Sequence, residues 1–204
     1  MPTLLHIDSS PRAASVSSFL CGVFVEKWKQ QNPGGTIFHH NATLERFPYL
    51  DEAAIDAIFM PSARGIAVQD QVLAFSDRMV DELLAADVVV LGAPMWNLSI
   101  PASLKAWIDL IVREGRTFAF SPQGVTPLVP PGKRVYVFSA RGGSYPADTP
   151  FRDFDHQEPY LRRILGVIGL TRIEFICAEH QSGDPEAAAR SLARARSAAD
   201  ALAE

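Results

Sequence analysis

The sequence predicts an α/β protein built on a doubly wound, five-stranded parallel sheet with helices on both faces. Two observations carry this prediction. Short runs rich in β-branched residues alternate with segments of helical periodicity from one end of the chain to the other. The central run, Asp87 to Gly92, is apolar without interruption after its first residue, which is typical of a strand buried on both sides of a parallel sheet.

The five expected strands are short, and each is followed by a turn or a helical segment. They are Leu4–Ile7, Thr36–His40, Asp87–Gly92, Arg134–Ser139 and Arg172–Cys177. Two further runs, residues 117–120 and 125–129, flank a turn that contains Pro and Gly. They predict a hairpin or a long excursion between strands.

The expected helices are recognised mainly by apolar residues three and four positions apart. They are Ser15–Gln31, Gln69–Ala86, Pro101–Arg113, His156–Ile168 and Asp184–Ala203. Ser99 could cap the third of these, and a proline suits its first turn. Residues 42–65 are interrupted by Pro48, Pro61 and Gly65, so a short helix with loops is expected there.

Length and composition narrow the class of protein. The 204 residues fit one domain, residues 1–204, without an internal repeat or a linker. The net charge of −4 argues against nucleic-acid binding, which needs clustered Lys and Arg. No apolar run approaches the ~20 residues of a membrane span, and no secretory signal precedes Asp8. Cys21 and Cys177 lie in apolar surroundings, so we expect unpaired thiols and a reducing, cytoplasmic location.

Motifs for metal-dependent or hydrolytic catalysis are missing from the sequence. It contains no HExxH or CxxC spacing. The adjacent His39 and His40 would lie on opposite faces of a strand. It also lacks the Gly-x-Ser-x-Gly elbow of the serine hydrolases. We therefore expect neither a metal site nor a serine nucleophile.

Three loops of unusual composition follow the first, third and fourth predicted strands. They span residues 8–18, 93–100 and 140–150. In an open parallel sheet, ligands gather outside the carboxyl ends of the strands, where the strand order reverses. We expect the functional site where these three loops converge.

The first loop has the composition of a phosphate site. It carries five serines and Arg12 and runs into a helix. Hydroxyls and free amides at a helix N-terminus bind phosphate, helped by the helix dipole. The glycine-rich dinucleotide fingerprint and the P-loop are both missing, so a terminal monophosphate is expected. The alternative is that Ser15 or Ser17 only caps the helix and the other serines form a turn.

The second and third loops offer surfaces for a flat ring. Met95, Trp96 and Leu98 present apolar and polarisable side chains, and Asn97 could pair with the edge of a ring. The paired glycines of the third loop allow backbone amides to approach a ligand. Each loop also has an ordinary interpretation, as core-filling side chains in the second and as a plain turn in the third.

Taken together, these motifs closely resemble those of the FMN-dependent NADH azoreductases and quinone reductases. The resemblance rests on Ser9-Ser10, Ser15-Val16-Ser17, Pro94-Met95-Trp96-Asn97-Leu98, Leu104-Lys105-Ala106-Trp107-Ile108-Asp109, Gly115-Arg116-Thr117-Phe118 and Ser139-Ala140-Arg141-Gly142-Gly143, and it extends over nearly the whole chain. It implies a flavodoxin-like fold with strand order 2-1-3-4-5 and a homodimer with FMN at the subunit interface. It also implies NADH or NADPH as the electron donor and a quinone or azo compound as the acceptor.

The same resemblance implies roles for particular residues. The FMN phosphate would be held by Ser10, Ser15, Val16 and Ser17. The ring would contact Pro94, Met95, Trp96, Asn97, Leu98, Ser139, Ala140, Arg141, Gly142 and Gly143. The acceptor pocket would be shaped by Phe118, Phe120 and Tyr145, and the partner subunit could supply the first two. This chain departs from residues that are common in the family at Val16, Trp96, Phe120, Ala140 and Tyr145.

By this resemblance, hydride passes from the reduced nicotinamide to flavin N5 and then to the acceptor, which predicts ping-pong kinetics. Asn97 would hold the ring near N5, and Arg141 with the amides of Gly142 and Gly143 would stabilise the reduced ring. No side chain is expected to be an essential nucleophile or general acid. The alternatives are a flavodoxin-type electron carrier, an NAD(P)H-dependent FMN reductase, and a flavin-free regulatory or structural domain.

Overall fold

The computed structural model of the protein describes residues 1–59 and 67–202. The predicted interruptions at Pro61 and Gly65 and the predicted helix end at Ala203 lie outside this part. Within it, the main sheet consists of the parallel strands β1 (Thr3–Asp8), β2 (Thr36–Asn41), β3 (Val88–Gly92), β6 (Arg134–Ala140) and β7 (Arg172–Ala178). Their order is β2-β1-β3-β6-β7, which confirms the predicted order 2-1-3-4-5 for successive strands of this sheet.

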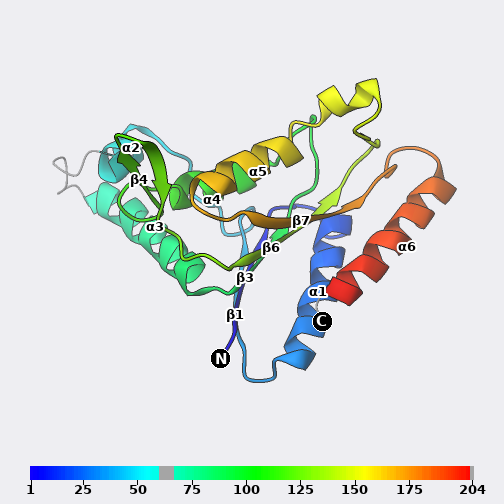
Figure 1. Ribbon diagram of the computed structural model, residues 1–204, viewed down its shortest axis with the longest axis horizontal. Helices are drawn as coiled ribbons and strands as arrows, with labels where there is room; N and C mark the ends of the chain where they lie inside the picture. The colour runs from blue at the N-terminus through cyan, green and yellow to red at the C-terminus, as the bar shows by residue number, and fades with distance from the viewer. Residues whose placement is uncertain (60–66, 203–204) are drawn as a thin grey trace.

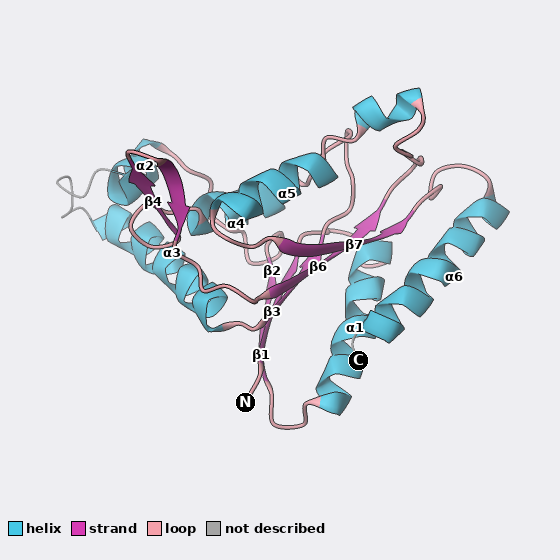
Figure 2. Ribbon diagram, viewed as in Figure 1, coloured by secondary structure: helices cyan, strands magenta, loops and turns pink. Residues whose placement is uncertain are grey.

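Helices flank the sheet, and a small hairpin stands apart from it (Figures 1 and 2). The α-helices of the described residues are α1 (Val16–Gln31), α2 (Glu52–Phe59), α3 (Ala67–Ala85), α4 (Ala102–Ile111), α5 (Glu158–Val167) and α6 (Pro185–Leu202). Figure 1 places α1 and α6 on one side of the sheet and α3, α4 and α5 on the other. The hairpin pairs β4 (Phe118–Ser121) with β5 (Gly124–Pro127) in antiparallel fashion.

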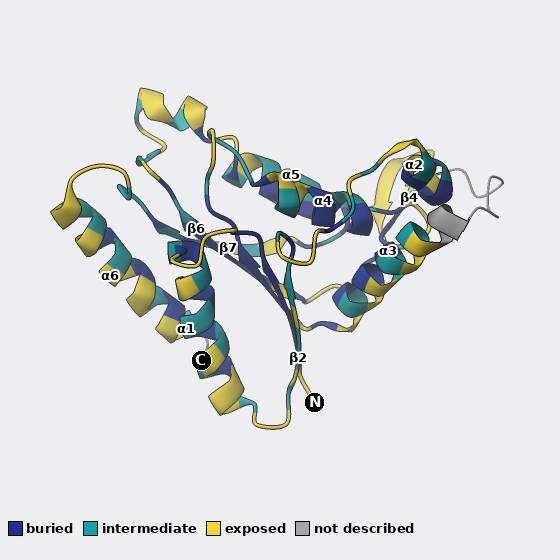
Figure 3. Cartoon of the chain, turned by 180° about the vertical axis from the view of Figure 1, so that it is seen from behind, coloured by how far each residue is buried: buried dark blue, intermediate teal, exposed yellow. Residues whose placement is uncertain are grey.

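Alternation of side chains along the strands gives the sheet two apolar faces. Leu4 and Val90 belong to a core cluster shared with α1 and α6. Leu5 and Val89 belong to the cluster shared with α3, α4 and α5. All residues of β3 are buried, and Figure 3 shows the sheet enclosed between the helices. Burial on both sides explains the uninterrupted apolar run in β3.

The helix that follows the second loop begins differently from the prediction. Ser99 does not cap α4: the N-cap residue is Pro101, which makes no side-chain cap bond. The backbone of Ser99 instead pairs with Trp96 in a tight turn. The chain then runs through Pro101 in an extended conformation, so the helix starts at Ala102.

The region before α5 also differs from the prediction. Residues 150–154 form a short 3-10 helix, η2, where no helix was predicted before His156. The helix predicted from His156 begins at Glu158. Its start is set by Asp155, whose Oδ1 accepts hydrogen bonds from the amides of Gln157 and Glu158, both at 3.0 Å.

None of the described helices is both long and apolar enough to cross a membrane. The described residues also contain no group of three or more His, Cys, Asp or Glu that could hold a metal ion. His39 stacks on His6, with ring centroids 4.5 Å apart, whereas His40 bonds to Glu45 and Glu82. The two adjacent histidines therefore point to different partners.

Candidate functional site

A cleft of about 320 Å³ opens where the loops after β1, β3 and β6 meet. It is lined by Ser10, Arg12, Ala14, Ser15, Val16, Pro94, Met95, Trp96, Ala140, Arg141, Gly142, Gln181 and Ser182. The three loops singled out in the sequence therefore converge, and a fourth segment, after β7, joins them. Larger hollows lie between β5 and α5 (about 620 Å³), between α1 and α6 (690 Å³), at the amino ends of β6 and β7 (490 Å³) and beside the loop after the edge strand β2 (360 Å³). None of these hollows lies between the loops after β1 and β3, where the strand order reverses and ligands bind in folds of this type, so the cleft is the candidate site.

The N-terminus of α1 forms one end of the cleft. Ser15 is its N-cap residue: the Ser15 Oγ accepts a hydrogen bond from the Ser18 amide at 3.2 Å and lies 3.0 Å from the Ser17 Oγ. The first amides of a helix have no intrahelical acceptor, and the helix dipole is positive at this end. The first turn of α1 contains no acidic residue. Together with Ser10 and Val16 in the lining, this end suits a phosphate group.

The loop that precedes α1 is held by hydroxyl groups from two other parts of the chain. The Ser9 carbonyl oxygen accepts hydrogen bonds from Thr43 Oγ1 at 3.1 Å and from Ser103 Oγ at 3.0 Å. The Ser9 hydroxyl donates to the Gly92 carbonyl oxygen at 2.6 Å. These bonds fix the position of the neighbouring Ser10 relative to the ends of β2 and β3 and the start of α4.

The second loop makes a tight turn in an uncommon backbone conformation. Asn97 and Leu98 have φ angles of 48° and 69°. Trp96 and Ser99 exchange backbone hydrogen bonds of 3.0 and 3.1 Å across them, the pattern of a type I′ turn. Left-handed backbone costs roughly 1–2 kcal/mol per residue outside glycine, and such strain concentrates at functional sites. The turn leaves Trp96 43% exposed beside the cleft.

The third loop packs closely against the segment after β7. The carbonyl oxygens of Arg141 and Gly142 accept hydrogen bonds from the amides of Gln181 and Ser182 at 3.0 and 3.4 Å. A Cβ atom added to Gly142 would lie 2.9 Å from the Ser182 Oγ and 3.3 Å from the Ser182 Cβ. Glycine at this position therefore leaves room for the Ser182 side chain in its present orientation at the wall of the cleft.

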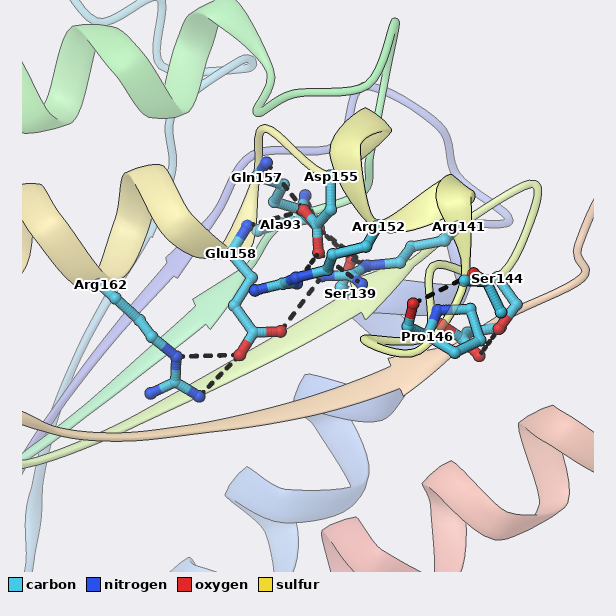
Figure 4. A network of polar contacts seen from close by, with 12 residues as sticks. Ala93, Ser139, Arg141, Ser144, Pro146, Arg152, Asp155, Gln157, Glu158 and Arg162 are labelled. Atoms are coloured by element: carbon cyan, nitrogen blue, oxygen red, sulfur yellow. Dashed lines mark hydrogen bonds and ion pairs between the residues drawn. The ribbon is translucent and has the colours of Figure 1, made fainter.

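A buried polar network lies behind the third loop (Figure 4). The fully buried Gln157 side chain accepts hydrogen bonds from Ser139 Oγ at 2.6 Å and Arg141 Nε at 3.2 Å. It donates to the Ala93 carbonyl oxygen at 3.0 Å. The Arg141 Nη1 donates to Asp155 Oδ2 at 3.1 Å. Arg141 was expected to stabilise a reduced ring, but its positive charge is balanced by the Asp155 carboxylate inside the protein.

The residues predicted for cofactor binding divide into two groups. Those that line the cleft are Ser10, Ser15, Val16, Pro94, Met95, Trp96, Ala140, Arg141 and Gly142. Those that belong to the same loops but not to the lining are Ser17, Asn97, Leu98, Ser139 and Gly143. Ser17 and Ser139 are fully buried, and both bond to other predicted residues of their loops.

The predicted acceptor residues are not brought together within one chain. Phe118 and Phe120 lie in β4, which Figure 1 shows well away from the ends of β6 and β7. Their rings contact each other edge to face, with centroids 5.3 Å apart, and Phe120 is 66% exposed. Tyr145 lies beside the third loop, where its ring centroid is 6.0 Å from the Arg141 guanidinium carbon.

No individual role was predicted from the sequence for four of the residues that line the cleft. They are Arg12, Ala14, Gln181 and Ser182. The first two belong to the serine-rich loop that was already singled out. Gln181 and Ser182 follow the last strand, so the rule that ligands gather at carboxyl ends of strands was the signal that could have found them.

Two titratable groups of the sheet, the half-buried Cys177 and the buried His6, are uncharged at neutral pH. Burial raises the pKa of Cys177 to about 11, so the thiol stays protonated and is a poor nucleophile. Burial and the neighbouring His39 lower the pKa of His6 to about 3, so its imidazole is neutral.

The cleft combines amides, hydroxyls and an exposed indole. This donor set fits a planar ring with one phosphate better than it fits covalent catalysis.

Comparisons with known proteins found a matching family model and similar proteins. A family model described as flavodoxin-like fold matches residues 2–203. An FMN-dependent NADH:quinone oxidoreductase from Nostoc sp. is 43% identical over 199 residues, which cover 97% of this chain and 96% of that protein. One from Burkholderia pseudomallei is 40% identical over 203 residues, covering 99% and 100% of the two chains. The crystal structure of an azoreductase from Bacillus anthracis matches with a TM-score of 0.90 at 28% identity, covering 100% and 99%.

Proposed function

The chain belongs to the flavodoxin-like fold family, and we propose that it is an FMN-dependent NADH:quinone oxidoreductase that also accepts azo compounds. The proposal is supported by 43% identity to the Nostoc oxidoreductase and by the shape it shares with the azoreductase. The structural observation that carries it is the meeting of a helix N-terminus, an exposed tryptophan and a close-packed glycine loop in one cleft.

In this proposal, the phosphate of FMN lies at the N-terminus of α1. Ser10 and Ser15 donate their hydroxyls to it, and Val16 donates its backbone amide. An apolar side chain at position 16 is therefore compatible with the role. The buried Ser17 hydroxyl, 3.0 Å from the Ser15 Oγ, holds the Ser15 hydroxyl in place. The absence of a glycine-rich turn from this loop fits a monophosphate and not a pyrophosphate.

The ring system lies between the second and third loops. Met95 and Trp96, which line the cleft, give it an apolar surface. Asn97 lies at the tip of the strained turn, just outside the lining, and is assigned to the edge of the ring. Backbone amides of the third loop approach it from the other side.

Bound FMN would supply the redox centre that takes up hydride from NADH and passes two electrons to the acceptor. The chain supplies orientation and shape. The exposed ring of Trp96 offers the nicotinamide and the acceptor the same flat wall, so one cleft serves both in turn. No side chain is assigned as an essential acid, and solvent supplies the remaining proton.

We further propose that the protein works as a homodimer in the cytoplasm. The strand β4, which carries Phe118 and Phe120, lies away from the ends of β6 and β7 (Figure 1), and the exposed Phe120 ring is typical of a contact surface. In a dimer these rings could complete the acceptor pocket of the partner. Cys21 and Cys177 are both free, as expected in a reducing compartment.

Steady-state kinetics test the proposed function. Initial rates with NADH varied at several fixed quinone concentrations should give parallel double-reciprocal lines. An electron carrier would be reduced without sustained turnover, and an FMN reductase would require added FMN as its saturating substrate. Intersecting lines would contradict alternate use of one cleft.

A further inference from the structure

Arg141 carries a buried positive charge at the wall of the cleft. The residue is 3% exposed and belongs to the lining. Its Nη1 lies 3.1 Å from Asp155 Oδ2, and its Nη2 lies 3.9 Å from Glu158 Oε2. The Asp155 side chain is fully buried, whereas that of Glu158 is 23% exposed and also pairs with Arg162. Asp155 is therefore the principal counter-charge of the Arg141 guanidinium.

The Asp155 carboxylate is fixed from several sides. Its Oδ1 accepts the hydrogen bonds from the Gln157 and Glu158 amides at the positive end of α5. Its Oδ2 accepts from Arg141 and, at 3.4 Å, from Arg152 Nη1. Figure 4 shows these groups converging on the carboxylate. Its distance from the Arg141 guanidinium is thus set by the fold.

Asp155 and Gln157 act on the cleft only through other residues, because neither is part of its lining. Gln157 bonds to Arg141 and Ser139 on one side and to Ala93 on the other. The network therefore holds the guanidinium of Arg141 in place relative to the ends of β3 and β6.

We infer that Asp155 is a positioning residue that lowers the reduction potential of the bound flavin by neutralising Arg141. The inference rests on the proposed function. Hydride brings two electrons and one proton, so its uptake leaves one additional negative charge on the ring. An unopposed guanidinium at the cleft wall would favour that charged product. The negative charge of Asp155 opposes the electric field of the Arg141 guanidinium, and in the protein interior such charges are little screened.

The midpoint potential of bound FMN, measured by anaerobic reduction against reference dyes, tests the inference. Asp155→Asn should raise the potential by about 30 mV or more, which equals a tenfold change in relative affinity for the two redox forms of a two-electron couple. Asp153→Asn is the matched control, because Asp153 is an exposed carboxylate in the nearby η2. Solvent screens the electric field of the Asp153 carboxylate, so Asp153→Asn should leave the midpoint potential of FMN unchanged.

Two further variants separate charge from structure. Arg141→Gln should lower the potential, and Glu158→Gln should raise it by less than Asp155→Asn. If the substitutions only loosened the loop, the potential shifts of Arg141→Gln and Glu158→Gln would not have opposite signs. Shifts of the same sign from Arg141→Gln and Glu158→Gln would overturn the inference even if Asp155→Asn failed to fold.

The outcomes also distinguish the inference from the proposed function. A wild-type chain that takes up no FMN would overturn both. A wild-type chain that binds and reduces FMN, with an Asp155→Asn potential equal to that of Asp153→Asn, would overturn the inference alone.

Discussion

Gly142 lies where the third loop packs against the segment after β7. Gly142→Ala places a Cβ atom 2.9 Å from the Ser182 Oγ, which must rotate away, and 3.3 Å from the Ser182 Cβ, which must shift slightly. This is mild overpacking that costs about 1 kcal/mol, so we expect FMN affinity to fall roughly fivefold. Fluorescence titration of the apoprotein with FMN measures this loss.

Gly183→Ala is the matched control for that variant. Gly183 lies in the segment after β7, does not line the cleft, and has open space where a Cβ would lie, so affinity should be unchanged. Gly142→Ala combined with Ser182→Gly should recover most of the lost affinity. Equal affinity of the Gly142→Ala and Gly183→Ala proteins would mean that the close packing has no part in binding.

Gln157 is expected to stabilise the fold as well as the site. Gln157→Leu keeps a similar volume but leaves buried polar atoms of Ala93, Ser139 and Arg141 without this partner. Each such group costs about 1–3 kcal/mol, so the free energy of unfolding should fall by about 3 kcal/mol or more. Urea denaturation measures the change.

Gln181→Leu is the comparison, at a half-buried glutamine that bonds to two carbonyl oxygens. It should lower the free energy of unfolding by less than Gln157→Leu does. Equal losses would contradict the stabilising role of Gln157.

The sequence could identify some of these residues and not others. Ser15 and Trp96 stand in loops after strands, and their side-chain types themselves point to a ligand. Gln157 precedes a helix of ordinary composition, and its bonds join segments that meet only in the folded chain. The positive φ angles of Asn97 and Leu98 could not be predicted either, because residues other than glycine rarely adopt them.

At the scale of elements, the N-terminus of α1 should serve both stability and binding. Ser15→Ala removes the cap bond to the Ser18 amide, which should cost about 1 kcal/mol in the free energy of unfolding. It should also weaken FMN binding, because one hydroxyl donor to the phosphate is lost. Thermal unfolding and FMN titration measure the two effects.

Ser18→Ala provides the comparison on the same helix. The Ser18 Oγ is buried and has no hydrogen-bond partner among the described residues, so its removal should change little. If both variants bind FMN equally well, the phosphate does not lie at this end of the helix.

The strands of the main sheet were predicted to within one residue at each end, because β-branched runs between turns mark them clearly. The 3-10 helix η2 was missed, since a five-residue element is too short to show a period. The start of α5 was placed too early because it depends on the Asp155 carboxylate, which accepts from the first amides of the helix.

At the scale of the whole molecule, the strand order decides where the site lies. β1 lies between β2 and β3, so the sheet winds in both directions from it, and the loops after β1 and β3 open at the same edge. The strand order and the edge where these loops open could be predicted, because right-handed crossovers leave few arrangements for alternating strands and helices. The place of the β4–β5 hairpin could not, since it depends on packing that no local pattern records.

The hairpin leads to a prediction about assembly. Light scattering should give twice the 22.3 kDa mass of one chain. Phe120→Ala should raise the KM for the quinone, because its ring is proposed to shape the acceptor pocket of the partner. It should leave FMN affinity unchanged, because the exposed ring does not line the cleft of its own chain. A fully active monomer would contradict this assignment.

The central claim is that the converging loops bind FMN in a position where NADH reduces it and a quinone reoxidises it. Anaerobic titration of the FMN-loaded protein tests this most directly. One equivalent of NADH per chain should bleach the flavin absorbance, and one equivalent of quinone should restore it. A protein that stays colourless with added FMN, or a bound flavin that NADH leaves oxidised, would contradict the account.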